Sequence, residues 1–138
     1  MTMRVAMLLV AVLAAPAAAQ DPDQGRIDFM TSCAQCHGTT GRGEGIIAQF
    51  LTVPPPDLTG IQRANDGIFP AGVIREIIEG GGSTGAHGSR EMPAWGDRFT
   101  TQAYLLLGWP HDEAEREALV QARIDGLVAF VARLQEQP

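Results

Sequence analysis

The chain contains only two cysteines, Cys33 and Cys36, and they are separated by two residues, with His37 directly after the second. The stretch around them reads TSCAQCHGTTGRGEG. A pair at this spacing can form a disulfide, hold a metal ion, act as a redox dithiol, or anchor a cofactor through two covalent bonds. Each possibility makes a different demand on the other residues, so this motif constrains the fold more than any other feature of the sequence.

Three of these possibilities find little support elsewhere in the sequence. A zinc site needs four ligands, and outside the motif only His87 and His111 offer a ring nitrogen, with no second pair at metal-binding spacing. A thioredoxin-like dithiol needs a strand before the motif within a βαβ unit, whereas a helical pattern precedes it here. A disulfide across two residues closes a loop too small to stabilise much, but it stays open as the simplest alternative.

The remaining interpretation is covalent haem attachment, for which Cys-x-x-Cys-His is a recognised motif. In this interpretation the sulfurs of Cys33 and Cys36 bond to the vinyl groups of one haem c per chain, and His37 binds the iron. Because both sulfurs hold one edge of the porphyrin, the residue after them is placed under the ring. The motif therefore predicts Cys33, Cys36 and His37 as cofactor-binding residues and His37 as an iron ligand.

Met92 is the methionine that we expect to bind the opposite face of the iron. Three of the other methionines lie within residues 1–19, and Met30 stands on the helical segment that carries the attachment motif, from which it cannot cross to the far face. Met92 belongs to a loop between two helices and is followed by a proline, which stiffens that loop. His87 is the rival ligand, and His111 is expected at the surface.

The N-terminal residues 1–19 have the pattern of a secretory signal peptide. A single basic residue, Arg4, is followed by an apolar run and then by three small residues, Ala17 to Ala19. The apolar run is shorter than the ~18–20 residues that span a bilayer, so we expect cleavage and no stable membrane anchor. The sequence thus predicts a single small domain at residues 20–138 in the periplasm, where covalent haem attachment takes place in bacteria.

The charge of the chain restricts its partners. The whole sequence has a net charge of −6 and no lysine, and removal of residues 1–19 would make it one unit more negative. An acidic surface disfavours nucleic acid and anionic membrane as partners. The expected partners are redox proteins, one electron donor and one acceptor.

Three helices are predicted from apolar spacing: residues 23–34, residues 70–79, and a long C-terminal helix that begins at Asp112. The run TVPPPDLTG between the first two should be extended, because proline cannot stand inside a helix. No strand pattern exceeds a few residues. We therefore expect an all-α fold with long loops.

The stretches CAQCHG, PPPDLT, MPAWG and IDGLVAFVARL together resemble the small bacterial monohaem class I cytochromes c, over about Asp23 to Gln135. The resemblance implies the cytochrome c fold, in which the N- and C-terminal helices cross and long loops wrap around one covalently bound haem. It also implies that Gly25 and Phe29 of the first helix meet two residues of the last helix, Leu127 and Phe130.

The same resemblance implies that a proline carbonyl holds the second ring nitrogen of His37. No Gly-Pro pair follows the motif closely here, and Pro54, Pro55 and Pro56 are the nearest candidates. The residues expected nearest the haem are Val73, Ile74, Ile77, Trp95, Phe99, Leu127 and Val128.

Two axial ligands leave no vacant site for substrate, so the expected function is one-electron transfer with no catalytic residues, and the protein is predicted not to be an enzyme. One alternative is a haem c subunit of a periplasmic or membrane-associated oxidoreductase complex, which would show a contiguous apolar surface patch. Another is a gas-binding or peroxidatic haem with a labile sixth ligand, which would bind carbon monoxide.

Overall fold

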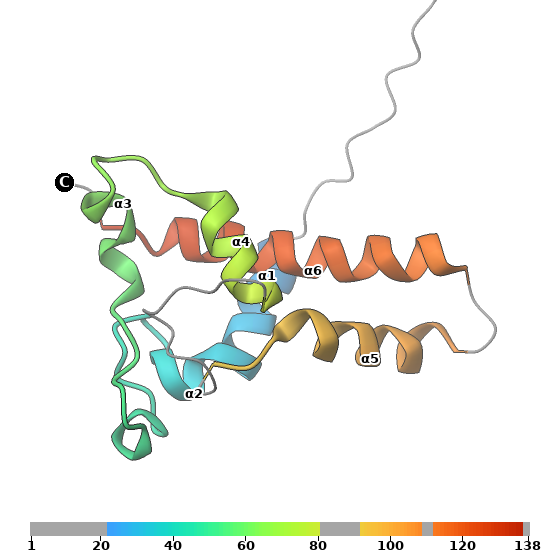
Figure 1. Cartoon of the computed structure of the whole chain (residues 1–138), viewed down its shortest axis with the longest axis horizontal. Coiled ribbons are helices and arrows are strands. Elements are labelled where there is room, and N and C mark those ends of the chain that lie inside the picture. Colours follow the sequence, from blue (N-terminus) through green and yellow to red (C-terminus); the bar gives the residue numbers. More distant parts are fainter. Residues whose placement is uncertain (1–21, 81–91, 109–111, 137–138) are drawn as a thin grey trace, which may run out of the picture.

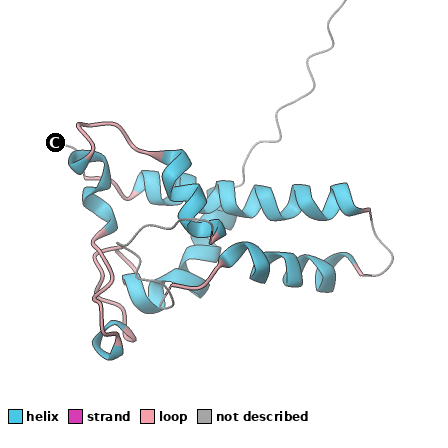
Figure 2. Cartoon of the chain, viewed as in Figure 1, coloured by secondary structure: helices cyan, strands magenta, loops and turns pink. Residues whose placement is uncertain are grey.

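Helices joined by long loops make up the computed structural model, which describes residues 22–80, 92–108 and 112–136 (Figures 1 and 2). No strand forms in these three ranges, and the all-α fold class is confirmed. Within the same ranges, no helix is both long and apolar enough to cross a membrane. The predicted signal peptide at residues 1–19 and the two histidines His87 and His111 lie outside the described residues.

The first helical segment delivers the cysteine motif. It consists of α1 (Pro22–Asp28), a π-helical turn η1 (Phe29–Cys33) and α2 (Ala34–His37). It therefore continues three residues beyond the predicted end at Ala34, so that the whole motif is helical. A π-helical turn is rare and often marks a functional site, because it shifts the direction of the side chains that follow it.

The middle of the chain is mostly loop, with three short helical pieces. These are the 3₁₀ turns η2 (Ala48–Phe50) and η3 (Leu58–Gly60), followed by α3 (Ile61–Ala64). The three prolines at 54–56 lie outside any helix, as predicted. Apolar residues at Leu58 and Ile61 turn this segment inwards against the core.

The second predicted helix is α4 (Ala71–Glu79), which starts directly after Pro70 and ends at Gly80. Gly80 has a φ of 94°, a left-handed conformation that glycine adopts without strain, so the predicted stop is confirmed. Val73 was expected among the residues nearest the haem, but it does not lie on the buried face of this helix. Val73 is 48% exposed, because the face that packs inwards is centred on Ile74 and Ile78.

One long helix, α5 (Trp95–Leu107), was not predicted from the sequence. Its buried residues, Trp95, Phe99 and Ala103, are spaced four apart and face α6 and the core. Leu105 and Leu106 are also apolar, yet they are 80% and 70% exposed. In Figure 1, α5 lies alongside the first half of α6.

The C-terminal helix α6 (Glu113–Arg133) runs along the whole molecule and contacts α1, α4 and α5 (Figure 1). It begins as predicted at Asp112, whose carboxylate accepts the backbone N–H of Ala114 at 2.9 Å. Its apolar stripe supplies half of the buried core. The buried apolar residues are Phe29, Ile78, Trp95, Phe99, Ala103, Val120, Ile124, Leu127, Phe130 and Val131.

The first and last helices cross at very close range, as the resemblance implied. The rings of Phe29 and Phe130 lie 4.9 Å apart between centroids. The nearest neighbour of Gly25 is Gly126: a Cβ added at Gly25 would lie 2.0 Å from the carbonyl oxygen of Gly126. Glycine is needed at Gly25 because the two backbones themselves are in contact.

Replacing Gly25 by alanine should therefore destabilise the fold. The new methyl group has only backbone atoms to displace, and such overpacking costs about 1–3 kcal/mol in the free energy of unfolding. Gly72 in α4 is the matched control, since nothing lies within 4 Å of a Cβ there. Gly72→Ala should leave stability unchanged or raise it by up to about 1 kcal/mol. Urea unfolding of the two variants measures both effects.

Candidate functional site

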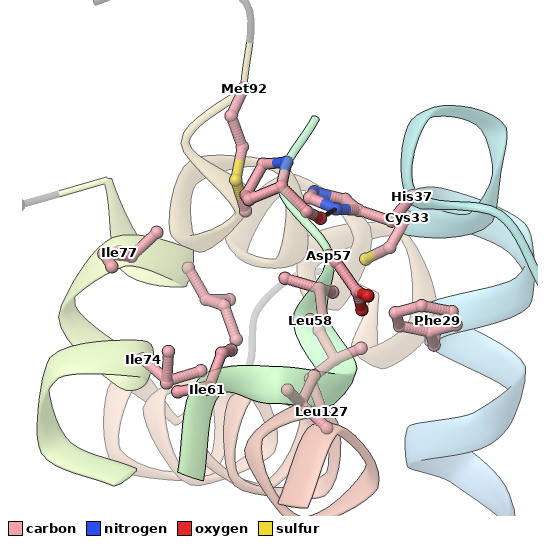
Figure 3. A pocket seen from close by; sticks show the side chains of 13 residues that line it. Phe29, Cys33, His37, Asp57, Leu58, Ile61, Ile74, Ile77, Met92 and Leu127 are labelled. Atoms are coloured by element: carbon pink, nitrogen blue, oxygen red, sulfur yellow. Dashed lines mark hydrogen bonds between the residues drawn. The ribbon is translucent and has the colours of Figure 1, made fainter. Parts of the chain in front are cut away.

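An apolar cleft lies between the first helical segment, α3, α4 and α6 (Figure 3). Its cavity volume is about 210 Å³, and it is open to solvent at its mouth. Its wall is almost entirely hydrophobic. The lining residues are Phe29, Cys33, His37, Pro56, Asp57, Leu58, Ile61, Ile74, Ile77, Ile78, Met92, Leu127 and Val131.

The cysteine motif stands at one wall of this cleft. Cys33 closes the π-helical turn and lines the cleft, and His37, the last residue of α2, reaches it as a buried side chain. Cys36 is half-buried and lies on α2 without being part of the lining. The thiols of Cys33 and Cys36 are free and are not joined in a disulfide.

The environment of Cys33 does not suit metal or redox chemistry of the thiol itself. Burial, followed by the charges of Asp28 and Cys36, raises the pKa of the Cys33 thiol to about 12. Cysteines that bind zinc or exchange disulfides act as thiolates and have lowered pKa values. The described residues also contain no cluster of three or more histidine, cysteine or acidic side chains that could hold a metal ion.

The glycine-rich loop at residues 38–45 folds back over the motif. The backbone N–H of Gly43 donates to the carbonyl of His37 at 2.8 Å, and that of Gly45 donates to the carbonyl of Cys36 at 3.0 Å. Gly43 has a φ of 82°, and a Cβ there would lie 2.4 Å from the carbonyl oxygen of Pro55. The loop thus packs the proline run directly against the motif.

The proline that faces His37 is Pro56. Its carbonyl oxygen lies 3.4 Å from Nδ1 of His37, at the long end of hydrogen-bonding distance, so an N–H at Nδ1 can donate to it. The carboxylate of Asp57 accepts both the hydroxyl and the backbone N–H of Thr59, at 2.7 and 2.8 Å. These two bonds lower the pKa of Asp57 and hold the turn that presents Pro56.

Met92 enters the cleft from the loop before α5. Its side chain is half-buried and lines the same cleft as His37 and Cys33, and Figure 3 shows its sulfur directed into the space between α4 and the motif. Three of the four predicted site residues, Cys33, His37 and Met92, therefore line one cleft. The fourth, Cys36, lies on α2 outside the lining.

The sequence predicted the cleft wall only in part. Ile74, Ile77 and Leu127 line it as expected, whereas Trp95 and Phe99 are buried in the core, and Val73 and Val128 are absent from the lining. Trp95 and Phe99 both stand on α5, a helix that was not predicted from the sequence. The unpredicted lining residues are Phe29, Pro56, Asp57, Leu58, Ile61, Ile78 and Val131.

Phe29 was expected at the helix crossing and serves both purposes, since its ring packs on Phe130 and also closes the cleft. The inward position of Leu58 and Ile61 could have been predicted from their three-residue spacing after the prolines. Apolar residues at helical spacing directly after an extended run indicate a short helix with one face turned inwards.

The helical fold and the cleft are consistent with the class of small monohaem cytochromes c that the resemblance implied. Comparison with protein families agrees: residues 20–105 match the family described as cytochrome C oxidase, cbb3-type, subunit III. The match covers more than half of the chain, which therefore belongs to this family. Comparisons with curated proteins and with solved structures gave no significant match.

Members of this cytochrome c family carry covalently attached haem c, and the residues of the cleft fit that cofactor. An apolar wall suits the porphyrin, and the cleft offers a thiol, an imidazole and a thioether among its lining residues. The imidazole is supported from behind by a backbone carbonyl, the usual arrangement for a metal-binding histidine.

Proposed function

We propose that this protein is a periplasmic one-electron carrier whose haem c is bonded to Cys33 and Cys36, with His37 and Met92 as the two iron ligands. Family membership supports electron transfer through haem. The observation that carries the finer proposal is that Cys33, His37 and Met92 line one apolar cleft, although they come from distant parts of the chain.

Haem c supplies an iron that changes charge by one electron. The protein controls this change through the groups around it. Pro56 orients the His37 ring and fixes the proton on Nδ1, which makes Nε2 the nitrogen for the iron. The Met92 thioether and the apolar wall both favour the ferrous state, so the midpoint potential should exceed that of a bis-histidine haem.

The location is proposed from the N-terminal sequence. Residues 1–19 have the pattern of an export signal, and the haem of such proteins is attached after export in bacteria. The donor and the acceptor would then be redox proteins of the same compartment. The acidic charge and the lack of lysine favour partners with basic or locally neutral docking surfaces.

Carbon monoxide tests whether both axial positions are filled. The ferrous wild-type protein is expected to keep an unchanged absorption spectrum under saturating carbon monoxide, because Met92 occupies the sixth position. A ferric protein with the same ligands should show the weak far-red band of a sulfur-to-iron transition. A shifted spectrum in the gas would instead indicate a labile sixth site and a gas-binding or peroxidatic haem.

A second candidate function is that of a haem subunit within an oxidoreductase complex. The family description, which names a subunit of an oxidase, favours it, as does a group of exposed apolar residues at the end of α5, where Tyr104, Leu105 and Leu106 are 39%, 80% and 70% exposed. Cell fractionation separates the two functions. A free carrier is released with the periplasm as a monomer, whereas a subunit stays with detergent-solubilised membranes and co-purifies in fixed stoichiometry.

A further inference from the structure

A buried ion pair joins the helix before the cysteine motif to the C-terminal helix. Asp28 of α1 is 1% exposed, and Arg123 of α6 meets it with two nitrogens. The Nε–H of Arg123 donates to Oδ2 at 3.0 Å, and its Nη2 donates to Oδ1 at 2.6 Å. This is the two-point geometry in which an arginine holds a carboxylate most firmly.

The remaining groups of the pair are also engaged, so both charges are held in place. Nη1 of Arg123 donates to the side-chain carbonyl of Gln102 at 2.5 Å, and Gln24 donates to Asp28 at 3.0 Å. The guanidinium carbon lies 4.1 Å from the ring centre of Phe99. The pair therefore connects α1, α5 and α6 in a site largely closed to water.

Each residue of this pair stands on a helical segment that also supplies a residue of the cleft wall. Asp28 precedes Phe29 in the chain, and Arg123 stands one helical turn before Leu127, and both Phe29 and Leu127 line the cleft (Figure 3). The charge of Asp28 also acts on Cys33, where it contributes to the raised pKa of the thiol. The charge of Asp28 thus acts on one residue that lines the cleft.

Stability alone is a weak reason for such a pair, because the cost of removing two charges from water often equals their attraction. An effect on the redox state of the haem is a stronger reason for this pair. Ferric haem carries one more positive charge than ferrous haem, so a nearby carboxylate favours the ferric state and a nearby guanidinium favours the ferrous state. In a poorly screened site these effects are larger than they are at the surface.

We propose that Asp28 and Arg123 act on the midpoint potential of the haem in opposite directions, with Asp28 lowering it and Arg123 raising it. This inference rests on the proposed function, since it requires haem c in the cleft. The two residues should change the midpoint potential in opposite directions, whereas the loss of either should change stability in the same direction. Removing either partner leaves a buried charge without its counterion, and both single variants should therefore be less stable than the wild type.

The test is the midpoint potential of the purified holoprotein at pH 8, where carboxyl groups are ordinarily ionised. Asp28→Asn should raise the potential and Arg123→Gln should lower it. The double variant Asp28→Asn with Arg123→Gln should return it towards the wild-type value. Arg123→Lys keeps the charge but loses the two-point geometry, so it should lower stability while the potential stays near that of the wild type.

An exposed ion pair provides the matched control. Arg42 and Glu136 form a pair with side chains 47% and 41% exposed, and Arg42→Gln and Glu136→Gln make the same charge changes under solvent screening. Their potentials should shift less than those of the buried variants. Shifts of Asp28→Asn and Arg123→Gln in the same direction, or no larger than these controls, would overturn the inference.

The spectrum distinguishes this failure from a failure of the proposed function. If the far-red sulfur band persists in the variants while their potentials do not separate, the carrier function stands and the role of the pair is wrong. If the wild type lacks covalent haem or lacks that band, the proposed function is wrong, and the inference that rests on it is overturned as well.

Discussion

A variant in which Cys33 and Cys36 are both replaced by alanine is expected to lose haem completely. Two thioether bonds would hold the cofactor in the wild type, and without them only the iron ligands and apolar contacts retain it. The purified variant should therefore be colourless, whereas acid-acetone should extract no haem from the wild type. Absorption spectra and haem-stained denaturing gels measure both results.

The single variants Cys33→Ala and Cys36→Ala serve as controls, because each keeps one thioether. Haem should remain bound to each of them through denaturation. The double variant should also unfold at lower urea concentration than the wild type, because an empty cleft leaves its apolar wall in contact with water. Free extraction of haem from the wild-type protein would contradict covalent attachment and, with it, the interpretation of the cysteine motif.

The attachment motif could be recognised from sequence because its information is local. Two thiols and a histidine within five residues constrain the chemistry before any fold is known. Elimination among the methionines also relied only on chain position. It selected Met92, which lines the same cleft as His37 in the structure. Helix ends marked by Asp112 and Gly80 were equally local, since a cap is formed by neighbouring residues.

Contacts between distant residues could not be predicted in the same way. Three consecutive prolines were equal candidates for the carbonyl facing His37, and only the packing of the glycine loop against Pro55 decides that Pro56 faces the ring. The ion pair of Asp28 and Arg123 joins residues 95 positions apart. No periodicity in the sequence indicates which of many acidic and basic residues will meet.

The helix α5 shows how a local signal can be masked. Its inward positions follow helical spacing, and the exposed Leu105 and Leu106 add apolar residues beyond that buried face. Because this helix went unrecognised, Trp95 and Phe99 were assigned to the cofactor when they belong to the core beneath it. The misplacement of Trp95 and Phe99 thus follows from one missed element, whereas Val73 and Val128 stand on helices that were predicted.

Replacing Met92 by alanine is expected to open the sixth coordination position of the iron. Haem should stay attached, because its covalent bonds and His37 are unchanged. The ferric protein should lose the far-red sulfur band, the midpoint potential should fall, and the ferrous form should bind carbon monoxide, which the wild type does not. Absorption spectra with and without the gas, together with a redox titration, measure all three effects.

Met30→Leu is the matched control for this variant. Met30 is half-buried and packs against the core on the helical segment before the motif, and leucine replaces methionine there with little change in volume. It removes a thioether from the same protein without touching the proposed ligand, so the band and the potential should persist. His87→Ala tests the rival ligand and should likewise leave the spectrum unchanged. If His87→Ala loses the native spectrum and Met92→Ala keeps it, the iron is bound by two histidines and the protein is not the high-potential carrier proposed here.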